Sequence, residues 1–172
     1  EAYIRRRRPL VLALNTQTEI EPELIDLRIA CHPVRLLADA ETHSRLPQPL
    51  ITPASMLPEG LRAALADKKL LDFGLGIARD RFEFHATHCM APSSLVLAYA
   101  LATATSGQAE RIIMAGFDGY PAGDARNEEI DTVLARFTDT SDRLAPVSVT
   151  PTMLECTTIS IYGLLASARI TQ

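Results

Sequence analysis

The chain has 172 residues, 47% of them hydrophobic and 22% charged, which suits one domain with a buried core and excludes a disordered chain. Its net charge of −4 argues against a nucleic-acid partner, because phosphate binding needs a concentrated cationic face. No apolar run approaches the roughly 20 residues that a membrane helix requires, so no membrane partner is expected. Three cysteines lie far apart in apolar stretches, which indicates reduced core residues of a cytoplasmic protein: Cys31, Cys89 and Cys156.

Short apolar runs alternate with helix-length segments along the chain, which is the pattern of βαβ units. The chain opens on what looks like a helix end carrying the basic run 5–8, so we expect a doubly wound domain whose first strand and turn are missing. An unbroken apolar run is typical of a strand that is covered on both faces of a parallel sheet. Such runs predict strands at 10–14, 27–31, 50–52, 111–115 and 147–149.

Helices are predicted where caps flank a helical composition. Ser93 or Ser94 can cap an alanine-rich helix that Gly107 can end, and Asp124 can cap an amphipathic one. The predicted helices span 58–66, 93–105 and 124–137. The remaining segments are 70–77 and 82–85, which form two strands or an edge hairpin, and 159–165, which is of uncertain type. The whole chain, residues 1–172, is therefore predicted to be one α/β domain, a three-layer Rossmann-like fold with a mostly parallel central sheet.

Polar residues that directly follow the predicted strands are the candidate site. Ligands of open parallel sheets bind beyond the carboxyl ends of the strands, and a helix N-terminus presents free N–H groups to an anion. One interpretation is a pocket for a phosphorylated or nucleotide-like ligand, and the other is a set of ordinary caps and turns. The candidate ligand-binding residues are Asn15, His32, Arg35, Ser93, Ser94, Asp118, Gly119, Tyr120, Asp124, Arg126, Thr150 and Thr152.

Asp118 carries the most weight among these residues. It follows a predicted buried strand and could orient a sugar hydroxyl, while Gly119 allows a tight turn behind it. Arg126 could contact an anion, and Asp124 could cap the helix that follows. The Asp118→Ala substitution is therefore expected to preserve the fold and abolish ligand binding.

Two weaker motifs are not expected to form sites. Gly74 and Gly76 resemble the start of a dinucleotide fingerprint, but no third glycine follows. His85 and His88 have the side chains of metal ligands, but on one strand this spacing points them to opposite faces. We therefore predict no metal site and no cofactor in this domain.

Several segments together resemble the C-terminal domain of a group of bacterial aldolase-like proteins. These are Asn15, residues 29–36 (Ile-Ala-Cys-His-Pro-Val-Arg-Leu), residues 113–120 (Ile-Met-Ala-Gly-Phe-Asp-Gly-Tyr) with 123–128, and the closing 149–152 and 160–162. The resemblance implies an N-terminal TIM barrel of the hydroxymethylglutaryl-CoA lyase type, similar to 4-hydroxy-2-oxovalerate aldolases. Any divalent metal would then lie in that barrel, because this chain has no His-x-His ligand pair.

A more distant resemblance is to the Rossmann-like nucleotide-sugar domain of bacterial sialyltransferases. It rests on the alanine-rich helix and the strand that ends before Asp118. This likeness implies that Asn15, His32 and the Ser93–Ser94 turn face a cytidine nucleotide. The Gly-x-Gly-Pro-Ser turn of those enzymes has no match here, and residues 124–137 contain no histidine where the catalytic one would lie.

Three hypotheses follow for the function. In the first, the chain is a non-catalytic or ligand-binding C-terminal domain of an aldolase, with a nucleotide-sugar or anion pocket. In the second, it is a glycosyltransferase domain whose general base would be His32, His85 or His88. In the third, it is a structural domain that forms a homo-oligomer or docks on the barrel through the apolar stretch 159–166.

Overall fold

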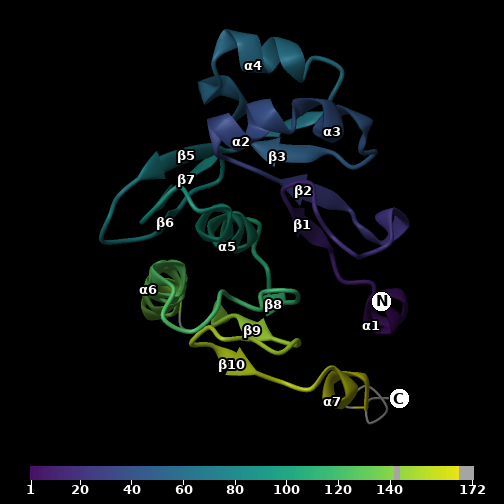
Figure 1. Cartoon of the computed structure of the whole chain (residues 1–172), viewed down its shortest axis with the longest axis vertical. Coiled ribbons are helices and arrows are strands. Elements are labelled where there is room, and N and C mark those ends of the chain that lie inside the picture. Colours follow the sequence, from purple (N-terminus) through teal and green to yellow (C-terminus); the bar gives the residue numbers. More distant parts are fainter. Residues whose placement is uncertain (142–143, 167–172) are drawn as a thin grey trace.

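The computed structural model describes residues 1–141 and 144–166 (Figure 1). It is a mixed α/β structure, as the sequence predicts, and most strand pairs are parallel. The strands do not form the single central sheet that was expected. They lie in three sheets instead.

The first sheet is parallel and takes its strands in chain order. The side chains of neighbouring Leu50 and Ile51 point to opposite faces and both are buried, so this sheet is covered on both faces. The predicted strands 10–14, 27–31 and 50–52 are confirmed, two of them shorter than predicted. The strands are β1 (Leu12–Leu14), β2 (Leu27–Ile29), β3 (Leu50–Thr52) and β4 (Leu70–Asp72).

The second sheet continues from the first through one extended segment. Phe73 N–H donates to Thr52 O at 3.1 Å, and Gly74 N–H donates to Thr87 O at 2.9 Å. Because successive amides of a strand point to opposite sides, residues 70–77 pair with the first sheet near their start and with the second near their end. The strand prediction for 70–77 and 82–85 is confirmed, with 70–77 divided into two strands. The alternative of a hairpin between these segments is wrong, because an unpredicted strand lies between them and pairs with both. The second sheet has the order β5 (Gly74–Ile77), β7 (His88–Ala91), β6 (Glu83–Phe84), with β6 antiparallel.

The third sheet is parallel and separate from the first. Its strands are only two residues long, and the outermost strand is exposed on both residues. The predicted strands 111–115 and 147–149 are found here in shortened form, paired with each other rather than with the main sheet. The uncertain stretch 159–165 follows the last strand as a helix. The strands are β8 (Ile113–Met114), β9 (Val147–Ser148) and β10 (Thr157–Thr158).

Short helices cover one face of the first sheet. Leu36 and Leu61 pack there on Leu50 in a cluster of their own. The helix predicted at 58–66 is confirmed, with Pro58 as its N-cap residue. Two further helices follow His32 and were not predicted, because the Pro33 that was interpreted as the end of a strand also begins a helix. They are α2 (Pro33–Ala38) and α3 (Ala40–Arg45), followed by α4 (Glu59–Ala64), with 3₁₀ turns at Pro22–Leu24 and Ala54–Met56.

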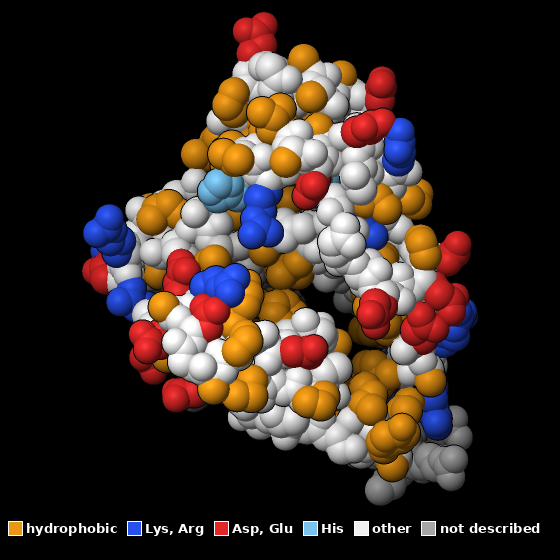
Figure 2. Space-filling view, in the orientation of Figure 1, with side chains coloured by type: hydrophobic (Ala, Val, Ile, Leu, Met, Phe, Trp, Pro, Cys, Tyr) orange, Lys and Arg blue, Asp and Glu red, His pale blue; other side chains and the backbone are white. Residues whose placement is uncertain are grey.

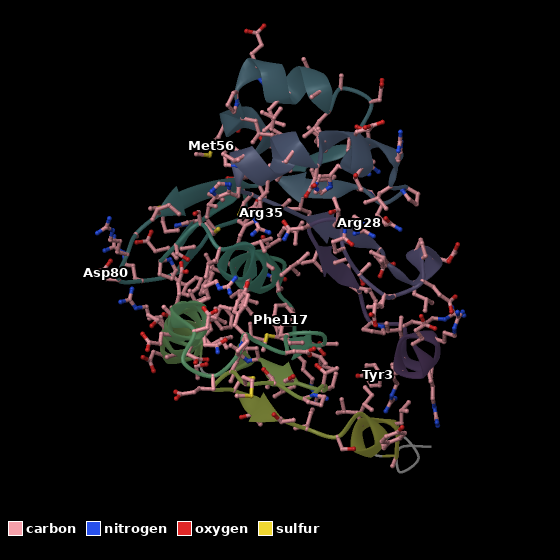
Figure 3. All side chains as sticks on the ribbon, in the orientation of Figure 1. Tyr3, Arg28, Arg35, Met56, Asp80 and Phe117 are labelled. Atoms are coloured by element: carbon pink, nitrogen blue, oxygen red, sulfur yellow. The ribbon has the colours of Figure 1, made fainter. Side chains whose placement is uncertain are left out.

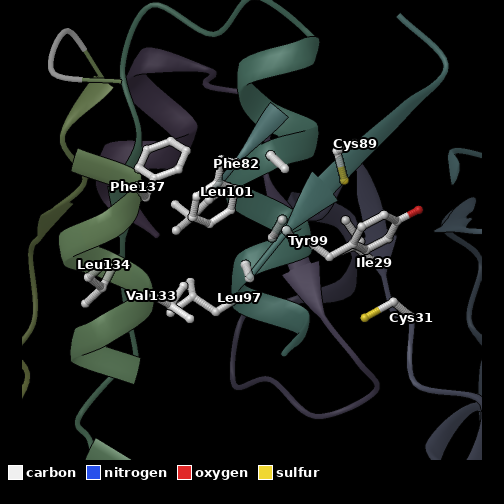
Figure 4. Close-up of a cluster of buried hydrophobic side chains, with 14 of the residues drawn as sticks. Ile29, Cys31, Phe82, Cys89, Leu97, Tyr99, Leu101, Val133, Leu134 and Phe137 are labelled. Atoms are coloured by element: carbon white, nitrogen blue, oxygen red, sulfur yellow. The ribbon is translucent and has the colours of Figure 1, made fainter. Parts of the chain in front are cut away.

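The other face of the first sheet packs against the longer helix α5 (Val96–Ser106), and α6 (Ala125–Thr140) packs on α5 (Figure 4). The fully buried Tyr99 donates its hydroxyl hydrogen to Phe73 O, which ties α5 to the segment shared by two sheets. The ring of Phe137 meets Phe82 edge to face at 5.3 Å. Both helices were predicted, and Asp124 caps α6 by accepting from Arg126 N–H at 2.9 Å.

The two ends of the described chain lie together. Helix α1 (Ala2–Arg7) is in contact with α7 (Ile161–Ala166). The basic run occupies the last turn of α1, and Arg5 pairs there with Glu21 at 2.5 Å. The interpretation of this run as an exposed helix end is confirmed.

Candidate functional site

Predicted site residues meet where β1 and β2 end, beside the loop that leads into α5. The Asn15 N–H donates to Ile29 O at 2.9 Å, which holds the end of β1 against β2. The thiol of Cys31, just after β2, donates to Ser94 O at 3.4 Å, which holds the α5 loop at the same end. We call this end of the sheet the β1–β2 edge, and it consists of Asn15, His32, Ser93 and Ser94.

The β1–β2 edge favours negative charge. Helix α5 has no side-chain cap, because it begins at Val96 and the Ser93 hydroxyl instead accepts from Leu95 N–H at 3.3 Å. The predicted serine cap is therefore wrong, and the first N–H groups of α5 are left for another acceptor. His32 and Arg35 are exposed, and Figure 3 shows Arg35 between α2 and α5 in this view. Neither side chain makes a hydrogen bond or ion pair with any residue that the structure describes.

A buried arginine that the sequence reasoning missed positions Asn15. The Arg28 Nη1 donates to Asn15 O and to Thr16 O, both at 3.1 Å, and its Nε donates to Gln48 Oε1 at 3.0 Å. Arg28 is 2% exposed, and this burial lowers the pKa of its guanidinium. Asn15 has the left-handed φ of 54°, so its carbonyl oxygen is turned to meet Arg28. The only signal in the sequence was a charged residue inside an apolar run.

A second group of predicted residues lies beyond the ends of β8 and β9. Thr150 Oγ1 accepts from Gly116 N–H at 3.0 Å, and the Thr152 hydroxyl donates to Phe117 O at 2.5 Å. These bonds join the two loops that follow the strands. We call this group the β8–β9 loop cluster: Asp118, Gly119, Tyr120, Asp124, Arg126, Thr150 and Thr152.

Asn127 ties the β8–β9 loop cluster to α6, and it too was missed. Its side chain accepts from Tyr120 N–H at 2.8 Å and donates to Tyr120 O at 2.9 Å. Gly119 has φ +85°, and a Cβ there would lie 3.1 Å from Asn127 Oδ1, so this turn requires glycine. The sequence gives little sign of the role of Asn127, because this residue lies three positions after the capping Asp124 and looks like an ordinary helical residue.

Arg126 contacts two residues of its own loop. Its guanidinium forms two bonds to Asp124, at 2.9 and 2.7 Å, and lies 3.7 Å from the centre of the Tyr120 ring. The hydrogen bonds from Arg126 lower the pKa of Asp124 to about 2. The predicted anion contact through Arg126 stays a prediction, and an anion there would compete with Asp124. By contrast, the Asp118 carboxylate makes no hydrogen bond or ion pair among the described residues.

No hydrogen bond or ion pair between described residues joins the β1–β2 edge to the β8–β9 loop cluster. Both groups follow the ends of parallel strands. The residues of the β1–β2 edge precede α5 in the chain, and those of the β8–β9 loop cluster come after it. The predicted site residues thus form two groups that no described bond joins, and one pocket made of both stays a prediction.

The cysteines are unsuited to nucleophilic chemistry. All three are free, and burial raises the pKa values of Cys31 and Cys89 to about 12. Because the thiolate is the reactive form, these two thiols stay protonated and inert near neutral pH.

His85 and His88 lie together rather than on opposite faces. The turn between β6 and β7 brings their rings into a stack, 4.3 Å between centroids. The opposite-face prediction is therefore wrong, because it placed both histidines on one strand. Both are exposed at the hairpin, and Glu83 Oε2 lies 3.4 Å from His85 Nε2.

Two buried polar atoms near the first sheet lack a hydrogen-bond partner among the described residues. One is the hydroxyl oxygen of Thr52 at the end of β3, and the other is Nδ1 of His43 in α3. Burial lowers the pKa of His43, with a smaller lowering from nearby Lys68 and Arg28. Two hollows lie elsewhere, one of about 420 Å³ beside Arg5 and Asp26, the other of about 440 Å³ beside Arg111 and Leu164.

Comparisons with known proteins add no identity to this geometry. No protein-family model matches the chain, and neither does any curated protein or solved structure. Within residues 1–141 and 144–166, no group of three or more histidine, cysteine or acidic side chains is placed to hold a metal ion. None of the helices in that part of the chain is both long and apolar enough to cross a membrane.

Proposed function

We propose that this chain is a ligand-binding, non-catalytic domain of an aldolase-like protein, and that an anionic ligand of the nucleotide-sugar class binds at the β1–β2 edge. One observation carries the proposal. The ends of β1 and β2 and the uncapped start of α5 meet there, beside two exposed and unpaired side chains, His32 and Arg35. The family resemblance supplies the aldolase context, with its metal-dependent barrel as a partner in the same protein.

The chemistry of the edge suits a phosphate group. An uncapped N-terminus of an 11-residue helix attracts an anion through its free N–H groups and its dipole. The Arg35 guanidinium can form two parallel bonds to phosphate oxygens. The Asn15 side chain can both donate and accept, which suits a base edge or a sugar hydroxyl.

The proposal includes a Rossmann-like fold and a cytoplasmic location. Helices on both faces of the first, parallel sheet support the fold, and so does α5, which contacts β1 and links β7 to β8. Three free cysteines support a reducing compartment.

Glycosyl transfer is the second candidate, favoured by the place of one histidine. His32 is exposed at the β1–β2 edge and could act as a general base there, whereas His85 and His88 lie on the β6–β7 hairpin. A purely structural role through residues 159–166 is the third, and Tyr162 of α7 is 79% exposed there.

A thermal-shift screen tests the proposal with cytidine, uridine and guanosine nucleotides, their sugar conjugates and acyl-CoA. At a ligand concentration of 100 Kd the fold gains about 2.7 kcal/mol, so we expect a rise in Tm of about 5–10 °C. Arg35→Gln and Asn15→Gly should each remove most of the rise, and the glycine keeps the left-handed backbone at that position.

Arg7→Gln is the matched control, because Arg7 is equally exposed but lies on α1 before β1 begins. It should leave the rise unchanged. A flat response to every nucleotide and to acyl-CoA, or equal losses in Arg7→Gln and Arg35→Gln, would rule out the β1–β2 edge as the binding site.

A further inference from the structure

Strand β1 has an unpaired backbone edge. Val11 O accepts from Leu27 N–H at 3.2 Å, and Asn15 N–H donates to Ile29 O at 2.9 Å, so the odd-numbered residues face β2. Successive amides of a strand alternate in direction, and the amide groups of Leu12 and Leu14 therefore point away from β2. β1 is the last strand on that side of its sheet.

Strand β8 has a similar edge. Ile112 O and Met114 O accept from the N–H groups of Val147 and Val149 at 3.2 and 2.9 Å, so these residues face β9. By the same alternation, the amides of Ile113 and Ala115 point away from β9. β8 ends the sheet order on that side.

The two open edges border one hollow. Figure 1 shows β8 as the strand of the third sheet nearest to the first, and β1 as the first-sheet strand nearest to it. Figure 2 shows the surface hollowed in this region, with hydrophobic side chains at its rim. Leu12 and Leu14 of β1, and Phe117 after β8, are only partly buried, and they pack on the core that α5 shares.

The chain exposes more surface than a compact monomer of the same mass. A compact monomer of this size exposes about 8,300 Å², whereas this chain exposes 10405 Å². The excess is about a quarter, more than the roughly 800 Å² that each partner buries in a stable protein interface. The structure therefore has unburied surface sufficient for a further docked segment.

We propose that the hollow between β1 and β8 is a docking groove for one extended, mainly apolar polypeptide strand. Only a polypeptide offers N–H and C=O groups alternately to both sides, which is what two facing strand edges require. The partly buried leucines of β1 and the neighbouring core demand apolar side chains on such a strand.

A docked strand would also unite the candidate site. Helix α5 contacts β1 and links β7 to β8, so a strand docked between β1 and β8 would join the first and third sheets into one whose order reverses there. Ligands of doubly wound sheets bind at such a reversal. Asn15 after β1 and Asp118 after β8 would then flank the end of the docked strand. The groove itself does not rest on the proposed ligand.

A fluorescein-labelled peptide tests the groove, with a core of alternating valine and leucine between pairs of lysines. We expect saturable binding to residues 1–172 by fluorescence anisotropy. Methylation of two adjacent core amides removes one donor toward each edge. It should weaken binding about tenfold or more, equivalent to about 1.4 kcal/mol.

Two proline variants locate the binding. Leu12→Pro removes an edge N–H that does not pair with β2, and it should weaken peptide binding about tenfold. Thr158→Pro removes the equivalent group at the opposite edge of the third sheet, because Ile159 N–H, one residue on, bonds to Ser148. It should leave binding unchanged. Absent binding, equal binding of the methylated peptide, or equal losses in both variants would overturn the proposal.

A cross-linking measurement checks the hollow without any peptide. A gap that holds one strand would set β1 and β8 about 9.5 Å apart, whereas a disulfide needs Cα atoms within about 7 Å. We expect no disulfide in the double variant Leu12→Cys with Ile113→Cys. Rapid, complete oxidation of that pair would show that the hollow closes on itself, and would equally overturn the proposal.

Discussion

The ends of the first and third sheets show two different uses of polar residues. At the β1–β2 edge the scaffold is held by backbone bonds and by the buried Arg28, so His32 and Arg35 remain unpaired among the described residues. In the β8–β9 loop cluster, Thr150, Thr152 and Asn127 themselves hold the loops. The difference follows from burial, because short exposed strands need side-chain bonds that deep strands do not. Polar side chains that make no hydrogen bond within the fold are the better candidates for ligand binding.

The largest expected effect is on the free energy of unfolding, and it should differ between the cores of the first and third sheets. Leu50→Ala should lower the free energy of unfolding by about 4 kcal/mol and Met114→Ala by about 2 kcal/mol. Leu50 is fully buried between two neighbouring strands and under α2 to α4, while β8 pairs on one side only. Urea denaturation measures both. Equal losses would remove the contrast between a deep and a shallow sheet.

Arg28→Met should cost about 3 kcal/mol of unfolding free energy, because it leaves Asn15 O, Thr16 O and Gln48 without their donor. Arg45→Met is the control, since Arg45 pairs with Glu41 on the exposed side of α3 and should cost less than about 1 kcal/mol. Guanidinium denaturation compares the two. Indistinguishable losses would show that Arg28 does not hold the end of β1.

Asn127→Ala should cost about 1–2 kcal/mol, because two hydrogen bonds to the Tyr120 backbone are lost. Amide exchange measured by NMR should speed up at Tyr120 and stay unchanged at Asn15. Unchanged exchange at Tyr120 would argue that the loop holds its shape without Asn127.

The smallest expected effect is on the stability of the fold at acid pH. The pKa of Asp124 is lowered to about 2 by its bonds from Arg126, against about 3.9 for a free aspartate. Its contribution to stability is therefore present above about pH 4 and is lost as the pH falls through 2. An NMR titration of the Asp124 carboxyl in Arg126→Gln should move back toward the ordinary value. A titration that stays near pH 2 in this variant would mean that Arg126 is not the cause.

The positions of the helices and strands could be predicted from the sequence better than the pairing between strands. Runs such as 50–52 predicted strands because burial on both faces leaves a continuous apolar signature. Asp124 marked the start of α6 because a cap is a local, side-chain feature. Pairing between distant strands leaves no such local mark, so the separation of β8 and β9 from the first sheet could not be predicted.

The candidate site was predicted as a set of residue types, but not as a geometry. His32 and Asn15 were identifiable because they follow apolar runs. That Arg126 binds Asp124, and that Asn127 holds Tyr120, depends on side-chain rotamers at the start of α6, which spacing does not specify. Arg28 and Thr52 escaped notice because they lie inside strands, where a polar residue usually indicates an exposed face.

The most direct test of the ligand site is an NMR titration of the ¹⁵N-labelled chain with cytidine monophosphate, followed at each backbone amide. We expect the shifts to concentrate at His32, Val96 and Leu97, beside the exposed His32 side chain and at the uncapped first turn of α5. The amides of Gly119 and Tyr120 should stay in place. Shifts confined to Gly119 and Tyr120, or no shifts at any amide, would contradict the assignment of the β1–β2 edge.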